Sequence, residues 1–238
     1  MNCRSCNEVV TEKYCGHCGN PALLKRVDGH YVLHEIQHVL HFEKGILYTV
    51  KGLLIRPGKN IRSFLLEDRS RLVKPVIYLV ITSLLYTIVA HLLHTEKGHT
   101  TPGIAADSAI TVMRDWVEHH YGYANMIMSL FIGGWLKLFV RKSGYNFFEI
   151  LIMLCFVMGT GMLLYTVFVI AEGTTGIKMT LPAEAILLAY SIWAIGQSLA
   201  GKPVWKYVSA LLAYILGMVS FWTIITLLGL VIDNYHKH

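Results

Sequence analysis

Four cysteines within the first 18 residues carry the clearest chemistry in this chain. They form two pairs, Cys3-x2-Cys6 and Cys15-x2-Cys18. Each pair can bring two thiolates around one metal ion within a tight turn, and two such turns complete a tetrahedral site. The spacing predicts a zinc ribbon over residues 1–22, with a rubredoxin-like iron site as the alternative. Because four thiolates leave no open position on the metal, we expect the zinc to be structural rather than catalytic.

A row of histidines follows the cysteines and forms a second candidate site. The four side chains lie on one face of a helix that the apolar pattern predicts between residues 30 and 42: His30, His34, His38 and His41. Imidazoles one helical turn apart can bind a transition metal, and their charge changes near about pH 6.5. The simpler interpretation is the polar face of a helix at a membrane surface, and a second metal or pH-responsive site is the alternative.

Basic residues ahead of the first long apolar segment form a third candidate site: Arg56, Lys59, Arg62, Arg69, Arg71 and Lys74. Only Glu67 and Asp68 oppose them in this stretch. Basic residues beside a first membrane span usually hold anionic headgroups and set the orientation of the chain. We therefore expect contacts with anionic lipids or with a protein partner here, and a nucleotide site is the alternative.

The basic residues border two short amphipathic helices, expected over residues 43–55 and 59–66. The Arg56-Pro57-Gly58 element separates them, because proline removes a backbone donor and disfavours helix at the residue before it. The first helix carries an apolar stripe made of Ile46, Leu47, Val50, Leu53 and Leu54, with Thr49 on its polar side. The second is expected to bury Ile61, Phe64 and Leu65. Both helices are too short to span a bilayer and suit its interface.

The composition indicates a membrane protein. Hydrophobic residues make up 54% of the chain and charged residues 15%, whereas soluble domains carry about 25% charged residues. We expect an all-α integral membrane protein in which the amphipathic segment 30–72 precedes five transmembrane helices. A span needs about 20 apolar residues, and the five segments that meet or approach this length are residues 73–93, 123–140, 147–171, 182–200 and 204–232.

The orientation follows from the distribution of Lys and Arg. Residues 1–72 carry 11 of the 21 basic residues, which places the N-terminus in the cytoplasm and, with five spans, the C-terminus outside. Zinc thiolates need a reducing compartment, which indicates the same side. No ladder of charges crosses the predicted spans, and His-Glu-x-x-His and phosphate-loop motifs are absent. These absences count against a proton-coupled transporter, an intramembrane protease and a phosphate-loop nucleotide site.

Small residues recur every fourth position in the last predicted span, at Ser209, Ala213 and Gly217. Such a face lets a second helix approach closely. We expect the partner to be another helix of the same chain, with a neighbouring subunit, and thus a homo-oligomer, as the alternative.

Several segments, in order, carry a family resemblance: Tyr14–Gly19 with the cysteine pairs, Phe42–Thr49, Leu54–Arg62, Lys74–Pro75 and Tyr145–Glu149. Together they resemble a bacterial zinc-ribbon membrane family of unknown function from Bacteroidetes (domain of unknown function 3667). The chain departs from the usual pattern at Asn20 and at Leu66–Arg69. The five-span order is also similar to the Yip-type membrane fold. The resemblance implies a bacterial inner membrane and membrane organisation rather than catalysis.

These observations predict a non-enzymatic membrane scaffold or adaptor, with the ribbon and the interfacial helices as a cytosolic platform for anionic lipids or a protein partner. A small transporter, channel or lipid-moving protein is the alternative. Nucleic-acid binding is not expected, because the charged residues of the ribbon balance: Arg4, Glu8, Glu12 and Lys13.

Overall fold

The computed structural model describes residues 45–68, 71–93, 108–141 and 144–236, together with residues 8, 9, 14, 16 and 17. The chain divides into two units, Met1–Glu43 and Lys44–His238. In the first unit, Val9 and Tyr14 each take part in an isolated β-bridge. The predicted zinc ligands and the histidine row lie outside the described residues, at Cys3, Cys6, Cys15, Cys18, His30, His34, His38 and His41. The zinc ribbon and the second metal site therefore stay predictions.

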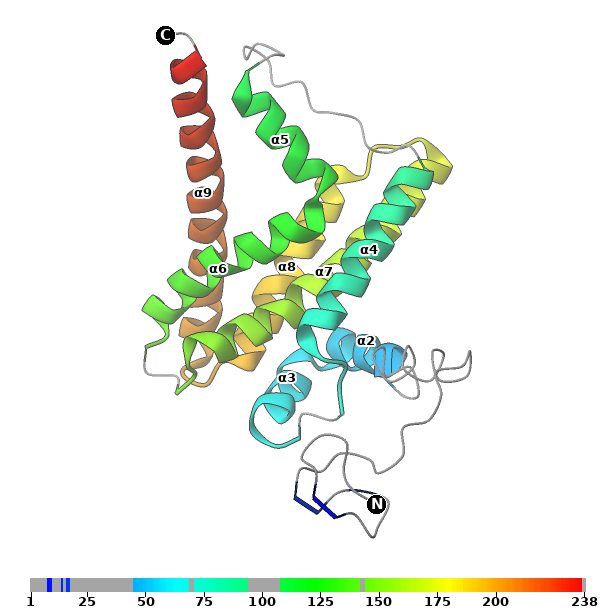
Figure 1. Ribbon diagram of the computed structural model, residues 1–238, viewed down its shortest axis with the longest axis vertical. Helices are drawn as coiled ribbons and strands as arrows, with labels where there is room; N and C mark the ends of the chain where they lie inside the picture. Colours follow the sequence, from blue (N-terminus) through cyan, green and yellow to red (C-terminus); the bar gives the residue numbers. More distant parts are fainter. Residues whose placement is uncertain are drawn as a thin grey trace. The chain divides into compact units, whose positions relative to one another are not determined.

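The described part of the second unit is built from helices alone (Figure 1). In chain order they are α2 (Gly45–Ile55), α3 (Pro57–Leu66), α4 (Pro75–Leu92), α5 (Ala109–His119), α6 (Tyr121–Phe139), α7 (Phe147–Thr175), α8 (Thr180–Ser198) and α9 (Pro203–His236). Each of the five predicted apolar segments falls on one of the helices α4, α6, α7, α8 and α9. Two short helices precede them, as the Arg56-Pro57-Gly58 break predicts.

Among the described residues, three helices are long and apolar enough to cross a membrane: α4, α7 and α9. These three helices indicate a membrane protein. The sequence led us to expect five spans, and the structure supports three. The helices α6 and α8 are 19 residues long each but fall outside this class. Polar residues within them, such as Asn125 and Lys137 in α6 and Gln197 in α8, lower their apolar character.

Glycines on α7 bring α4 close to it. A Cβ atom at Gly159 would lie 2.8 Å from the Tyr78 ring, and one at Gly173 would lie 2.9 Å from the Leu93 side chain. The earlier residue of α4 meets the earlier glycine of α7 and the later residue meets the later glycine, so the two helices run in the same direction. They lie side by side in Figure 1. The Tyr78 hydroxyl also forms a hydrogen bond with the Thr160 hydroxyl at 3.0 Å. Small residues thus serve here as packing positions.

The helix α9 packs against α5, α6 and α8. Trp135 on α6 donates a hydrogen bond from Nε1 to the Ser220 hydroxyl at 3.0 Å, and Gly196 on α8 lies against the Tyr207 ring. The core of the unit is continuous across these helices, with Leu136, Leu154 and Ala194 fully buried.

The helix α5 was not expected, because it lies in the long stretch between the first two predicted spans, residues 73–93 and 123–140, which was interpreted as a loop. Ser108 caps its N-terminus and accepts a hydrogen bond from the Ile110 amide at 3.2 Å. The Asp233 carboxylate near the end of α9 accepts two more, from the Ser108 hydroxyl at 2.6 Å and from the Ala109 amide at 2.7 Å. Ile110 and Val117 are buried. The capping serine and the apolar spacing that follows it were the available signals.

Candidate functional site: a basic pocket between α2 and α3

The turn between α2 and α3 is closed by one side chain, that of Asn60. Its amide nitrogen donates to the carbonyl oxygens of Gly52 at 2.8 Å and of Arg56 at 2.9 Å. Each of these oxygens also accepts a backbone bond, from the Arg56 amide at 2.9 Å and from the Asn60 amide at 3.2 Å, so the side chain adds a second donor to both. Pro57 begins α3, where its missing amide hydrogen costs nothing. The α2–α3 hairpin, residues 45–66, is therefore held by a specific clamp.

The hairpin packs onto α7 and α8. As predicted, Ile61, Phe64 and Leu65 are buried, and the Phe64 ring meets the Phe156 ring edge-on at 5.1 Å between centroids. A Cβ atom at Gly58 would lie 2.5 Å from the backbone of Gln197. The two helices α3 and α8 are therefore so close at this point that only glycine fits.

The helix α2 faces the bundle differently from the prediction. Thr49, expected on the polar side, is fully buried, and its hydroxyl accepts a hydrogen bond from the Val73 amide at 3.1 Å. Leu47, expected in the apolar stripe, is 82% exposed. A buried threonine is tolerated because its hydroxyl pairs with a backbone donor that also needs a partner. This bond joins α2 to the segment that leads into α4.

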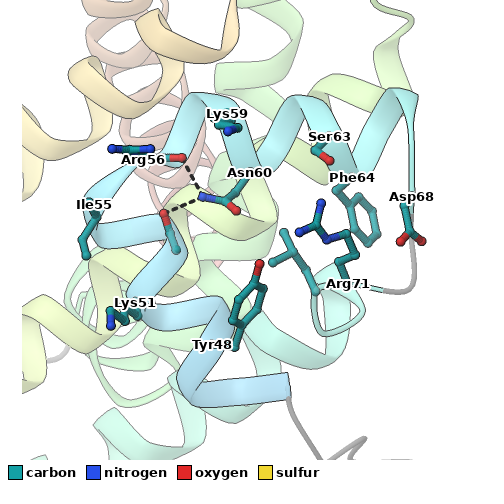
Figure 2. A pocket seen from close by; sticks show the side chains of 12 residues that line it. Tyr48, Lys51, Ile55, Arg56, Lys59, Asn60, Ser63, Phe64, Asp68 and Arg71 are labelled. Atoms are coloured by element: carbon teal, nitrogen blue, oxygen red, sulfur yellow. Dashed lines mark hydrogen bonds between the residues drawn. The ribbon is translucent and has the colours of Figure 1, made fainter.

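A pocket of about 300 Å³ lies between α2, α3 and the segment before α4 (Figure 2). Its charged lining consists of Lys51, Arg56, Lys59, Arg71 and Asp68. The uncharged lining consists of Tyr48, Gly52, Ile55, Asn60, Ser63, Phe64 and Leu72. In Figure 2 the Asn60 amide lies in the middle, with Lys51 and Arg56 on one side and Arg71 on the other. Four cationic side chains against one carboxylate give the pocket a net positive charge, suited to an anion.

The pocket gathers half of the basic residues named from the sequence. Arg56, Lys59 and Arg71 line it, whereas the Arg62 Nε donates to the Gly58 carbonyl oxygen at 3.1 Å. Lys74 is exposed at the N-cap position of α4, and Arg69 lies outside the described residues. Lys51 joins the lining. It is not among the six basic residues named from the sequence, because its place depends on how α2 docks.

The Tyr145-Asn146-x-x-Glu149 segment ties together the ends of α6, α7 and α8. Asn146 and Glu149 form a capping box at the start of α7, with both hydrogen bonds at 2.8 Å. The Tyr145 hydroxyl donates to the Ser198 carbonyl oxygen at 3.2 Å, and the Lys137 ammonium donates to the Tyr145 carbonyl oxygen at 2.6 Å. The segment is therefore a helix cap and a brace rather than a ligand site.

Burial raises the pKa of the Tyr145 hydroxyl above its ordinary value, and the nearby Arg62 partly offsets this effect. The hydroxyl therefore stays protonated at neutral pH and remains a donor to Ser198.

The small residues of α9 face another helix of the same chain. Ser209 and Ala213 are buried, and a Cβ atom at Gly217 would lie 2.7 Å from the Ile132 Cα on α6. Within the described residues, no group of three or more His, Cys, Asp or Glu side chains is arranged to hold a metal ion.

Residues 43–87 match a family described as "Protein of unknown function (DUF3667)". The matched segment contains α2, α3, every residue that lines the pocket and the first part of α4. Searches of curated proteins and of solved structures found no match to the chain.

Proposed function

We propose that the chain is a multi-pass protein of a bacterial inner membrane that acts as a non-enzymatic scaffold, with the α2–α3 hairpin as a binding platform on its cytosolic side. One observation carries this proposal. The hairpin is fixed to α7 and α8 by buried residues, while the cationic side chains of its pocket are exposed. A rigid, charged surface on a membrane anchor suits docking, since little conformational freedom is lost when a partner binds.

The proposal includes five membrane spans, α4, α6, α7, α8 and α9. The packing of α6 and α8 against α7 and α9 supports spanning roles for them, because polar residues in a span are tolerated inside a bundle. The order of spans would then be similar to that of Yip-type proteins.

Reporter fusions test the number of spans. With five spans, a fusion ending at Gly144 places the reporter in the cytoplasm and one ending at Ile177 places it outside. With α4, α7 and α9 as the only spans, both results are reversed. Green fluorescent protein, which reports the cytoplasm, and alkaline phosphatase, which reports the periplasm, distinguish the two topologies.

The zinc ribbon extends the platform in this proposal. Structural zinc held by the four cysteines would fold a module too small to keep a core of its own. Its reduced thiolates agree with the cytosolic side. The histidine row between ribbon and hairpin stays a candidate for metal or pH sensing.

A pull-down in mild detergent tests the platform itself. Proteins and lipids that co-purify with the wild-type chain are compared by quantitative mass spectrometry with those of Gly58→Ile, which forces α3 away from α8. We expect a defined set of partners to be lost in this variant while the bundle remains folded. Identical sets for a folded variant and the wild type would contradict the platform.

A second candidate function is lipid movement, favoured by an apolar groove on α8 and α9. The groove has a volume of about 590 Å³ and is lined by residues that include Leu188, Tyr214, Met218 and Trp222. Purified protein in liposomes that carry a fluorescent lipid tests it: faster exchange of the lipid between leaflets would favour this candidate over the scaffold.

A further inference from the structure

We propose that the pocket between α2 and α3 binds the phosphate of an anionic glycerophospholipid. The inference deepens the proposed function, since it names one ligand class for the platform. It has three parts: the charge of the pocket, its size and its position beside α4.

The charge favours a phosphate. Lys51, Arg56, Lys59 and Arg71 line the pocket, and Asp68 is the carboxylate among the lining residues. Arginine offers paired donors that match phosphate oxygens, and lysine offers a compact charge. Two neutral donors of the lining are already engaged, because the Asn60 amide binds two carbonyl oxygens and the Ser63 hydroxyl donates to the Glu67 carboxylate. The Tyr48 hydroxyl points toward the middle of the pocket (Figure 2) and offers one neutral donor beside four cations. This lining suits a phosphate better than a nucleotide base, which would require a pattern of several neutral donors and acceptors.

The size and position favour a lipid. A volume of about 300 Å³ lies at the lower end of small-molecule sites and suits a phosphate with its glycerol. Leu72 lines the pocket and α4, the first candidate span, begins three residues later at Pro75. Beside the cations, Tyr48 is 47% exposed and Ile55 57% exposed. An anionic head next to exposed apolar side chains at the foot of a span matches an amphiphile better than a soluble anion.

The test uses the full-length chain in mild detergent with a limiting equimolar mixture of phosphatidylglycerol and phosphatidylcholine. Native mass spectrometry counts the copies of each lipid retained. The pocket variant is Lys51→Gln with Arg71→Gln. The matched control is Arg141→Gln with Lys202→Gln, which removes the same charge from exposed positions on the same predicted side.

We expect the wild type to prefer phosphatidylglycerol. The pocket variant should lose this preference by on the order of tenfold, as the removal of two cations near a headgroup implies. The control should keep it within about twofold. The charge-preserving variant Lys51→Arg with Arg71→Lys should also retain it, and a thermal unfolding curve establishes that each variant is folded.

Three results would overturn the inference. The wild type would bind both lipids equally, the folded pocket variant would keep its preference, or glycerol 3-phosphate, which has no acyl chains, would bind as tightly as phosphatidylglycerol and identify a soluble anion as the ligand. These results leave the platform open to a protein partner, which the pull-down with Gly58→Ile tests separately.

Discussion

The side chain of Asn60 lies against Gly52, and its amide nitrogen donates to the Gly52 carbonyl oxygen at 2.8 Å. A Cβ atom at position 52 would lie 3.2 Å from the Asn60 Cγ, so the glycine makes room for the amide that closes the turn. Because the same nitrogen also reaches the Arg56 carbonyl oxygen, one residue sets the geometry of the hairpin and of the pocket that it shapes.

The replacement Asn60→Ala should loosen the hairpin without disturbing the bundle. Two carbonyl oxygens lose the side-chain donor and keep a backbone donor, which implies a loss of about 0.5–1.5 kcal/mol in the free energy of unfolding. Hydrogen exchange of the backbone amides in residues 45–66 should accelerate, while exchange in α7 stays slow. Asn234→Ala, at an exposed site on α9, is the control and should change stability by less than about 0.5 kcal/mol. Equal exchange in both variants would contradict the clamp.

The replacement Gly58→Ala should destabilise the chain although alanine favours helices. Its Cβ atom would meet the Gln197 backbone at 2.5 Å, and such overpacking typically costs about 1–3 kcal/mol. Gly134→Ala on α6 is the matched control, since nothing lies within 4 Å of the Cβ position there. The control should be neutral or stabilising by up to about 1 kcal/mol. Thermal unfolding in detergent compares the two, and a Gly58 variant as stable as the Gly134 variant would show that α3 does not pack closely on α8.

Tyr145 should make the brace sensitive to alkaline pH. Burial raises the pKa of its hydroxyl above the value of about 10 expected in the unfolded chain. The stabilisation is therefore fully present below about pH 10 and is lost as the pH rises through the higher pKa of the folded state. At pH 7, Tyr145→Phe should cost about 1 kcal/mol through the lost bond to Ser198. As the pH rises above about 10 in a thermal unfolding series, the gap between wild type and variant should shrink; a constant gap would argue against a buried hydroxyl.

Zinc should bind the purified chain at a ratio of about one ion per chain, as expected for a single four-thiolate site. Elemental analysis measures the ratio. Cys15→Ser with Cys18→Ser should remove the metal, whereas Cys155→Ser, which changes the half-buried cysteine of α7, should retain it. Iron in place of zinc would indicate the rubredoxin-like alternative. A wild-type chain without bound metal would contradict the predicted zinc ribbon.

The sequence predicts where the helices lie along the chain better than it predicts which side of each helix is buried. Apolar runs locate α4 and α7 within a few residues, because length and composition alone define a candidate span. Thr49 and Leu47 show the limit: a helix at the edge of a bundle selects its buried face by the partners available there, such as the Val73 amide. That choice also places Lys51 at the pocket.

The candidate site could be anticipated only in part for the same reason. The run of basic residues is visible in the sequence, yet Arg62 is turned toward the Gly58 carbonyl oxygen and Arg71 lines the pocket. The Arg62 side chain bonds to its own helix four residues back, whereas Arg71 reaches the pocket from the segment that leads into α4. The role of Asn60 was also hidden, since an asparagine inside a short helix usually signals nothing beyond weak helix propensity.

Photo-crosslinking from the pocket tests the central claim, that the hairpin is a binding platform, most directly. Benzoylphenylalanine replaces Tyr48 at the pocket or, as the control, Tyr123 on α6, which is exposed but distant in the chain. In intact cells, position 48 should yield a discrete lipid or protein adduct that Lys51→Gln with Arg71→Gln abolishes, and position 123 should not yield the same adduct. The same adducts at both positions, or an adduct at position 48 that persists without the two cations, would contradict the account.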